Sequence, residues 1–181
     1  MGGGPPFLTQ TAPVSPRENP EPHDEEDGLQ RGLTLSYRYL NRRDRTEAEV
    51  RAHLDGKGIA AADAEQAVSV LRDQGYVDDA RYARLLAEDK RNLEGWGGER
   101  IRRTLAAHGI DRELIEEALA GDEQEPASEI DRAVAVLSRR FPRPPRDRRE
   151  RDRALGVLLR KGYDLELALD ALARHGSDVN D

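Results

Sequence analysis

The stretch Gly75–Ala83, which reads Gly-Tyr-Val-Asp-Asp-Ala-Arg-Tyr-Ala, ends one helix and begins another with almost no residues between them. Gly75 follows an apolar run with helical spacing, and glycine readily adopts the left-handed conformation that closes a helix. Leu71, four residues before it, and Tyr76, directly after it, are placed as the hydrophobic pair of a Schellman motif. Asp78 then caps the next helix through its side-chain oxygen. The stretch therefore predicts two helices joined at a fixed angle.

The same cap pattern, Leu-x-x-x-Gly followed by an apolar residue, recurs at Gly58, Gly109 and Gly162, which are separated by 51 and 53 residues. When the chain is aligned on these glycines, further apolar positions coincide on both sides at helical spacing. Those positions hold Val50, Ile101 and Ala154; Ala64, Ile115 and Ala168; Ala67, Ala118 and Ala171; and Val68, Leu119 and Leu172. Such self-similarity at a nearly fixed period indicates an internal repeat.

Each repeat contains a helix, a glycine turn and a second helix, and a further helical run precedes each pair, at about 33–42, 78–93 and 128–140. We predict an all-α fold, an elongated array of three tandem three-helix repeats that resemble helix-turn-helix units. The charged residues make up 36% of the chain and the aromatic residues 4%, which favours small cores along an array. The expected repeats are 33–77, 78–121 and 122–175, with a short linker at 121–126 and a frayed end at 176–181. The cap glycines, Gly58, Gly75, Gly109 and Gly162, are predicted to have positive φ.

Residues 1–32 are predicted to be a disordered acidic tail. The segment is rich in proline and glycine and carries two arginines against six carboxylates, a net charge of −4. With few apolar side chains to bury, its removal up to residue 30 is expected to leave the melting temperature unchanged. A regulatory acidic tail is the alternative interpretation.

No pattern in the chain predicts catalysis, a cofactor or a metal. There are no cysteines, which excludes disulfides and thiolate chemistry. No histidine pair has metal-ligand spacing, and no phosphate-binding glycine loop or nucleophile motif is present. No apolar run approaches the ~20 residues of a membrane span, and no signal-peptide pattern is seen. A non-enzymatic, cytoplasmic protein is expected. The histidines concerned are His23, His53, His108 and His175.

Binding is the remaining class of function, and the arginines are the candidate residues. They form three patches, of which the last, Arg139–Arg153, holds eight arginines against three carboxylates, a net charge of +5. These patches are either solvated faces balanced by nearby acids or a surface that binds carboxylates or phosphates. Because Ile101 and Leu105 mark the buried side of their helix, at least two of its three arginines are expected to be exposed. The candidate partner-binding residues are Arg42, Arg43, Arg45, Arg51, Arg100, Arg102, Arg103, Arg148 and Arg149.

Trp96, the only tryptophan, lies in the glycine turn Gly95–Gly98. It is predicted to pack over that turn, and a contact with a partner is the alternative.

Several motifs together resemble the RecX family of recombination regulators over residues 33–174. They are Thr46-x-x-Glu-Val, Lys57-Gly-Ile, the Gly75–Ala83 stretch, Gly95-x-Gly-Gly-x-Arg-Ile and Leu105-x-x-x-Gly-Ile. The resemblance implies tandem three-helix repeats, no catalytic motif, and binding to RecA nucleoprotein filaments that inhibits ATP hydrolysis and strand exchange. A monomer with weak direct DNA contact is expected. The third repeat departs from the family through its Pro/Arg insertion and its alanine-rich core. A nucleic-acid-binding helical module and an adaptor for another protein remain alternatives.

Overall fold

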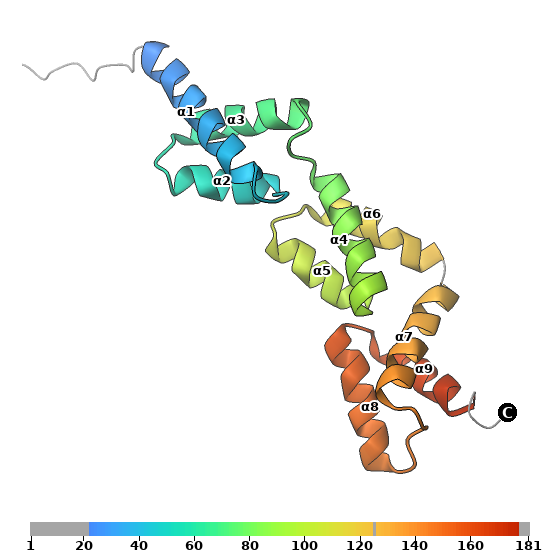
Figure 1. The fold of residues 1–181 in the computed structure, drawn as a ribbon. Helices are drawn as coiled ribbons and strands as arrows, with labels where there is room; N and C mark the ends of the chain where they lie inside the picture. Colours follow the sequence, from blue (N-terminus) through green and yellow to red (C-terminus); the bar gives the residue numbers. More distant parts are fainter. Residues whose placement is uncertain (1–21, 125, 178–181) are drawn as a thin grey trace, which may run out of the picture.

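The computed structural model describes residues 22–124 and 126–177, and over these ranges the chain forms nine helices and no strand. They line up as three successive groups of three along an elongated molecule, with α1 at one end and α8 and α9 at the other (Figure 1). The predicted all-α array of tandem three-helix repeats is confirmed. The helices are α1 (Pro22–Leu40), α2 (Glu47–Asp55), α3 (Ala61–Asp73), α4 (Asp79–Glu94), α5 (Gly98–Ala107), α6 (Arg112–Gln124), α7 (Pro126–Arg140), α8 (Arg148–Lys161) and α9 (Leu165–Ser177).

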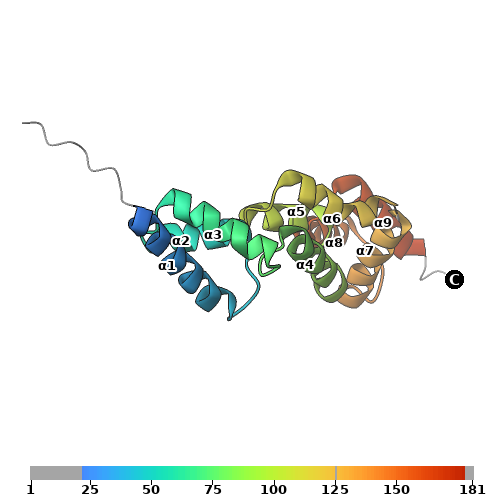
Figure 2. The ribbon, with the colours of Figure 1, turned by 90° about the horizontal axis from the view of Figure 1, so that it is seen from above.

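Each group has its own small hydrophobic core. The first helix packs against the third, α1 on α3, α4 on α6 and α7 on α9, and the second helix also packs on the third. In the view from above, α1–α3 lie to one side and the helices of the second and third groups overlap (Figure 2). The apolar positions aligned on Gly58, Gly109 and Gly162 are all buried. Three clusters in series are therefore the outcome of the repeated pattern.

The predicted cap glycines all have positive φ, with values of 73° at Gly58, 75° at Gly75, 75° at Gly109 and 89° at Gly162. In each case the residue after the glycine donates its amide to the carbonyl of the leucine that lies four residues before the glycine. The Tyr76 amide, for example, donates to the carbonyl of Leu71 at 2.9 Å. This is the hydrogen bond that defines the Schellman motif, so the cap prediction is confirmed.

A second regular contact joins one group to the next. The start of α2 meets the turn between α5 and α6, where the Thr46 hydroxyl donates to the carbonyl of His108 at 2.7 Å. The start of α5 meets the turn between α8 and α9 in the same way, since the amide of Gly97 donates to the carbonyl of Lys161 at 2.9 Å. Gly162 lies so close to Arg100 that a side chain there would overlap its backbone. These contacts set the orientation of each repeat relative to the next one.

The prediction of a disordered tail over residues 1–32 is wrong from Pro22 onwards, because α1 begins there. Leu29 packs against the first core cluster, and α1 packs on α3. A single leucine in this polar part of α1 is enough for the helix to pack on the core, because α3 supplies the opposing surface. Residues 1–21 lie outside the described residues.

The predicted linker at residues 121–126 is also wrong, because α6 continues to Gln124 and α7 begins at Pro126. Proline is compatible with the first position of a helix, where its missing amide hydrogen is not needed. The predicted frayed end is helical as far as Ser177, and residues 178–181 lie outside the described residues. None of the helices described is both long and apolar enough to cross a bilayer.

Candidate interaction surface

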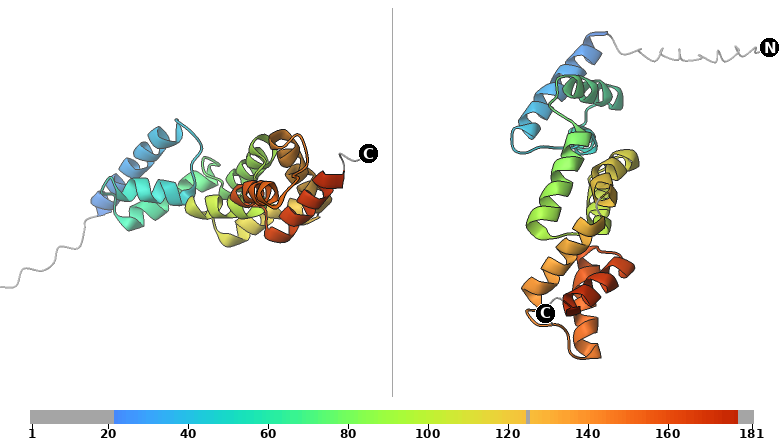
Figure 3. Two further views of the ribbon diagram at one scale, coloured as in Figure 1. Left: turned by 90° about the horizontal axis from the view of Figure 1, so that it is seen from below. Right: turned by 90° about the vertical axis from the view of Figure 1, so that its right-hand side faces the viewer.

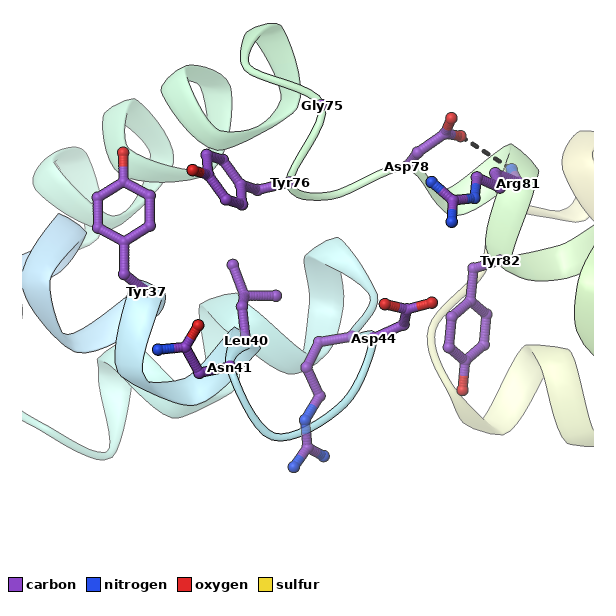
Figure 4. Close-up of a pocket in the computed structure, with 10 residues that line it drawn as sticks. Tyr37, Leu40, Asn41, Asp44, Gly75, Tyr76, Asp78, Arg81 and Tyr82 are labelled. Carbon is purple, nitrogen blue, oxygen red and sulfur yellow. Dashed lines mark hydrogen bonds between the residues drawn. The ribbon is translucent and has the colours of Figure 1, made fainter.

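A groove lies where the first repeat, α1–α3, meets the second repeat, α4–α6 (Figure 4). It has a volume of about 380 Å³ and is formed by the end of α1, the Gly75 turn and the start of α4. We call it the joint groove, and its lining residues are Tyr37, Leu40, Asn41, Asp44, Arg45, Gly75, Tyr76, Asp78, Arg81 and Tyr82.

Tyr76 is the most exposed aromatic side chain of this groove, at 58% of its full accessibility. The residues that follow the other cap glycines, Ile59, Ile110 and Tyr163, are buried. The difference arises because the Gly75 turn lies between repeats, where no third helix of the same repeat covers it. The ring of Tyr76 instead meets the ring of Tyr37 edge to face, with centroids 5.2 Å apart. The sequence pattern predicts a helix-cap contact for Tyr76 with Leu71, and it does not predict that the side chain is exposed.

Glu49 organises the charges beside the joint groove. Its carboxylate pairs with Arg43 at 2.9 Å and with Arg45 at 3.5 Å, and it accepts the Thr46 amide at 3.3 Å as part of a capping box. Burial alone raises the pKa of Glu49, but the Thr46 amide and the two arginines together lower that pKa below its ordinary value.

Arg45, one of the predicted partner contacts, is mostly buried. Only 14% of its side chain is exposed, and its guanidinium lies 4.1 Å from the centroid of the Tyr39 ring. The ring of Tyr39 also stacks in parallel on the ring of His53. Arg42 and Arg81, by contrast, are exposed and have no ion pair with any carboxylate in the described part of the chain.

Arg51 and Arg102, which the repeat alignment makes equivalent, form equivalent contacts. The Nε atom of Arg51 lies 2.7 Å from Glu65, and that of Arg102 lies 3.0 Å from Glu116. Each pair joins the second helix of a repeat to the third. The hydrogen bond from Arg102 lowers the pKa of Glu116. Both guanidinium groups are therefore engaged within their own repeats.

The expected exposure of at least two arginines on α5 is wrong, because only Arg103 is exposed, whereas Arg100 and Arg102 are half-buried. The Arg100 guanidinium lies 3.8 Å from the centroid of the Trp96 ring and reaches the carbonyl of Arg160 in the third repeat at 3.4 Å. Helical spacing identifies the side of α5 that faces its own core, but it does not reveal what a neighbouring repeat covers. Trp96 itself is partly buried and packs against the second core cluster, and its predicted packing over the glycine turn stays a prediction.

The remaining candidates, Arg148 and Arg149, lie at the start of α8 and are exposed. Arg148 is 95% exposed and 3.9 Å from Asp152. The structure thus divides the predicted arginines between the joint groove, the middle of the array and its far end. Those that stay exposed are Arg42, Arg43, Arg103, Arg148 and Arg149.

Comparisons with known proteins agree with this architecture. Residues 33–71 match the model of the first three-helix domain of RecX, and residues 78–119 match that of the second. The regulatory protein RecX of Chromohalobacter salexigens is 34% identical over 137 residues, which cover 75% of this chain and 87% of that protein. The RecX protein of Trichlorobacter lovleyi is 36% identical over 135 residues, 72% of this chain and 86% of that one.

A solved structure shows the same fold. The crystal structure of RecX from Lactobacillus salivarius has a TM-score of 0.73 at 22% identity, covering 83% of this chain and 97% of that one. The chain belongs to the RecX family, as its motifs indicated.

Proposed function

We propose that this chain is a non-enzymatic, cytoplasmic regulator of homologous recombination and DNA repair. It binds RecA nucleoprotein filaments and inhibits ATP hydrolysis and strand exchange by the recombinase. The observation that carries the proposal is its similarity, at 34–36% identity over most of the chain, to proteins named as regulatory RecX proteins.

The shape of the molecule supports this function. Three repeats in a row form a long surface rather than one enclosed site (Figure 1). A long array can contact several subunits of a filament at once, and weak contacts then reinforce one another through their high effective concentration. Among the described residues, no cluster of three or more side chains is placed to hold a metal ion.

The joint groove is the contact surface that we assign to the recombinase filament. Aromatic residues and arginine are enriched where proteins bind one another. The groove offers Tyr76, exposed and held against Tyr37, and Arg81, which has no carboxylate partner in the described chain. Arg42, Arg43 and Arg103 supply further charged contacts along the array.

ATP hydrolysis by RecA on single-stranded DNA tests the function, with strand exchange as a second readout. The parent chain should lower both rates as its concentration rises. Tyr76→Ala combined with Arg81→Ala should weaken that inhibition. Leu93→Ala with Arg84→Ala, which removes an exposed apolar residue and an exposed arginine elsewhere on α4, should inhibit like the parent.

The possible outcomes distinguish the proposed function from the choice of the joint groove as the contact surface. A parent chain that leaves both rates unchanged contradicts the proposed function. Inhibition that survives in the groove variant keeps the function and excludes the joint groove as the contact surface. Melting curves of both variants check that each remains folded.

A further inference from the structure

The end of the array opposite α1 carries a concentration of positive charge. Eight arginines lie on the last turn of α7, the proline-rich loop and the first turns of α8, and all are exposed. Figure 3 shows this loop at the far end of the molecule. The segment has a net charge of +5 in a chain of net charge −7. We call these residues the terminal arginine cluster: Arg139, Arg140, Arg143, Arg146, Arg148, Arg149, Arg151 and Arg153.

The carboxylates of the segment do little to neutralise the cluster. Asp147 accepts the amide of Glu150 at 2.7 Å, and Glu150 accepts the amide of Arg146 at 2.9 Å. Asp152 is 3.9 Å from the Nε atom of Arg148, too far for a hydrogen bond. Within the described residues, the cluster therefore lacks the close carboxylate partners that Arg51 and Arg102 have.

The cluster also does not serve the stability of α8. Arg148, Arg149 and Arg151 lie at the N-terminal end of this helix, where the helix dipole disfavours positive charge. In stability terms, carboxylates would be preferred at these positions. An anionic partner would relieve both the dipole effect and the repulsion between neighbouring guanidinium groups.

The position of the cluster in the array is distinctive. In the first two repeats the start of the second helix meets the glycine turn of the next repeat, through Thr46 and Gly97. The aligned residue of the third repeat is Glu150, and α8 begins earlier, at Arg148. The added start of α8 and the preceding loop thus occupy the place where a fourth repeat would dock. A surface that elsewhere meets protein is open to solvent here.

The loop gathers four of these arginines around one hollow of about 420 Å³. Three prolines restrict its backbone. Its first residue is also held in place, since the buried His175 is 3.0 Å from the carbonyl of Phe141 through Nε2 and 3.3 Å from Ser138 through Nδ1. The arginines that line the hollow are Arg140, Arg143, Arg146 and Arg153.

We propose that the terminal arginine cluster binds the phosphate backbone of nucleic acid. The planar guanidinium group matches the geometry of phosphate oxygens and can bind two of them at once. Phe141, the aromatic residue of the loop, packs against the third core cluster and is not free to stack on bases. Binding is therefore independent of sequence and is shared by duplex and single strand. It does not rest on the proposed function, since it needs no recombinase.

The test is the salt dependence of binding to a labelled DNA duplex of mixed sequence, and to its single strand, measured by fluorescence anisotropy. The parent is compared with a cluster variant, Arg140→Gln, Arg143→Gln, Arg146→Gln and Arg153→Gln. A control variant carries the same change of charge at exposed arginines elsewhere: Arg31→Gln, Arg38→Gln, Arg84→Gln and Arg112→Gln.

For the parent, the logarithm of the duplex affinity should fall linearly with the logarithm of salt concentration. Removing one arginine–phosphate contact reduces that slope by about 0.9, so the cluster variant should lose about two to four units of slope and at least about tenfold in affinity at low salt. The control variant should keep the slope of the parent.

Equal losses in both variants, or no loss in either, would overturn the proposal. It is also overturned if the cluster variant binds DNA like the parent but no longer binds polyglutamate, since the partner would then be an acidic protein. A second variant, Arg148→Gln, Arg149→Gln and Arg151→Gln, guards against misfolding. It should raise the melting temperature slightly and weaken DNA binding, whereas weaker binding together with a lower melting temperature counts against the cluster.

Discussion

Glu49 shows how a single side chain can hold two repeats together. It closes the cap of α2, pairs with Arg43 and Arg45, and lies 3.6 Å from Nδ1 of His108 in the second repeat. These partners lower the pKa of Glu49 in the folded chain in spite of its burial. The carboxylate is thus harder to protonate in the folded state than in the unfolded chain.

A group with a lowered folded pKa stabilises the fold above its unfolded pKa, and that contribution is lost as the pH falls through the folded value. Glu49→Gln should therefore cost about 1 kcal/mol at neutral pH, and the difference from the parent should shrink below about pH 4.5. Urea unfolding across that range measures it. Glu113→Gln, at an exposed glutamate, is the control. A difference that stays constant with pH would contradict this account.

The arginines mark the limit of prediction at this scale. Arg102 and Arg103 are adjacent in sequence, yet one pairs with Glu116 and the other is exposed. The outcome depends on which residues α6 and the third repeat place nearby, and helical spacing within α5 does not contain that information. Tyr76 could not be recognised as exposed for the same reason.

The glycine turns are the elements that sequence predicts best, because a cap is a local structure. The leucine, the glycine and the next apolar residue form the motif within six consecutive positions. What the sequence does not reveal is the contact that each turn makes with a neighbouring repeat. A Cβ atom added at Gly58 would have no neighbour within 4 Å, whereas one added at Gly162 would meet the backbone of Arg100.

This contrast predicts different costs for the same substitution. Gly58→Ala should destabilise the chain by about 1–2 kcal/mol, because alanine resists the left-handed conformation. Gly162→Ala should cost more, about 3 kcal/mol or above, because the added carbon also forces the second and third repeats apart. Thermal or urea unfolding compares the two variants. Equal losses would show that the turn does not position the neighbouring repeat.

The start of α1 gives a second test at the scale of the element. A chain that begins at Arg31 lacks Leu29, which packs on the first core cluster, whereas a chain that begins at Pro22 keeps it. The shorter chain should melt a few degrees lower, because full burial of a leucine contributes about 1.5–3 kcal/mol and the partly buried Leu29 contributes a part of that. Identical melting temperatures would show that this part of α1 does not contribute to the core.

At the scale of the molecule, the array follows from cores that are small and local. The alignment on three glycines is sufficient to predict the order of the helices, since each repeat buries its own apolar residues. The boundaries at α1 and between α6 and α7 are beyond it, because the proline that begins α1 and the one that begins α7 are also typical of loops, although proline is compatible with the first position of a helix. The charged end of the array is a property of the third repeat alone.

The proposed function requires that this array binds the recombinase filament rather than its separate components. Co-sedimentation compares the chain with RecA filaments on single-stranded DNA, with the same DNA alone and with RecA alone, at one salt concentration. We expect saturable binding to filaments that is tighter than binding to either component and that persists when the terminal arginine cluster is substituted. Filament binding no tighter than binding to DNA alone would contradict it.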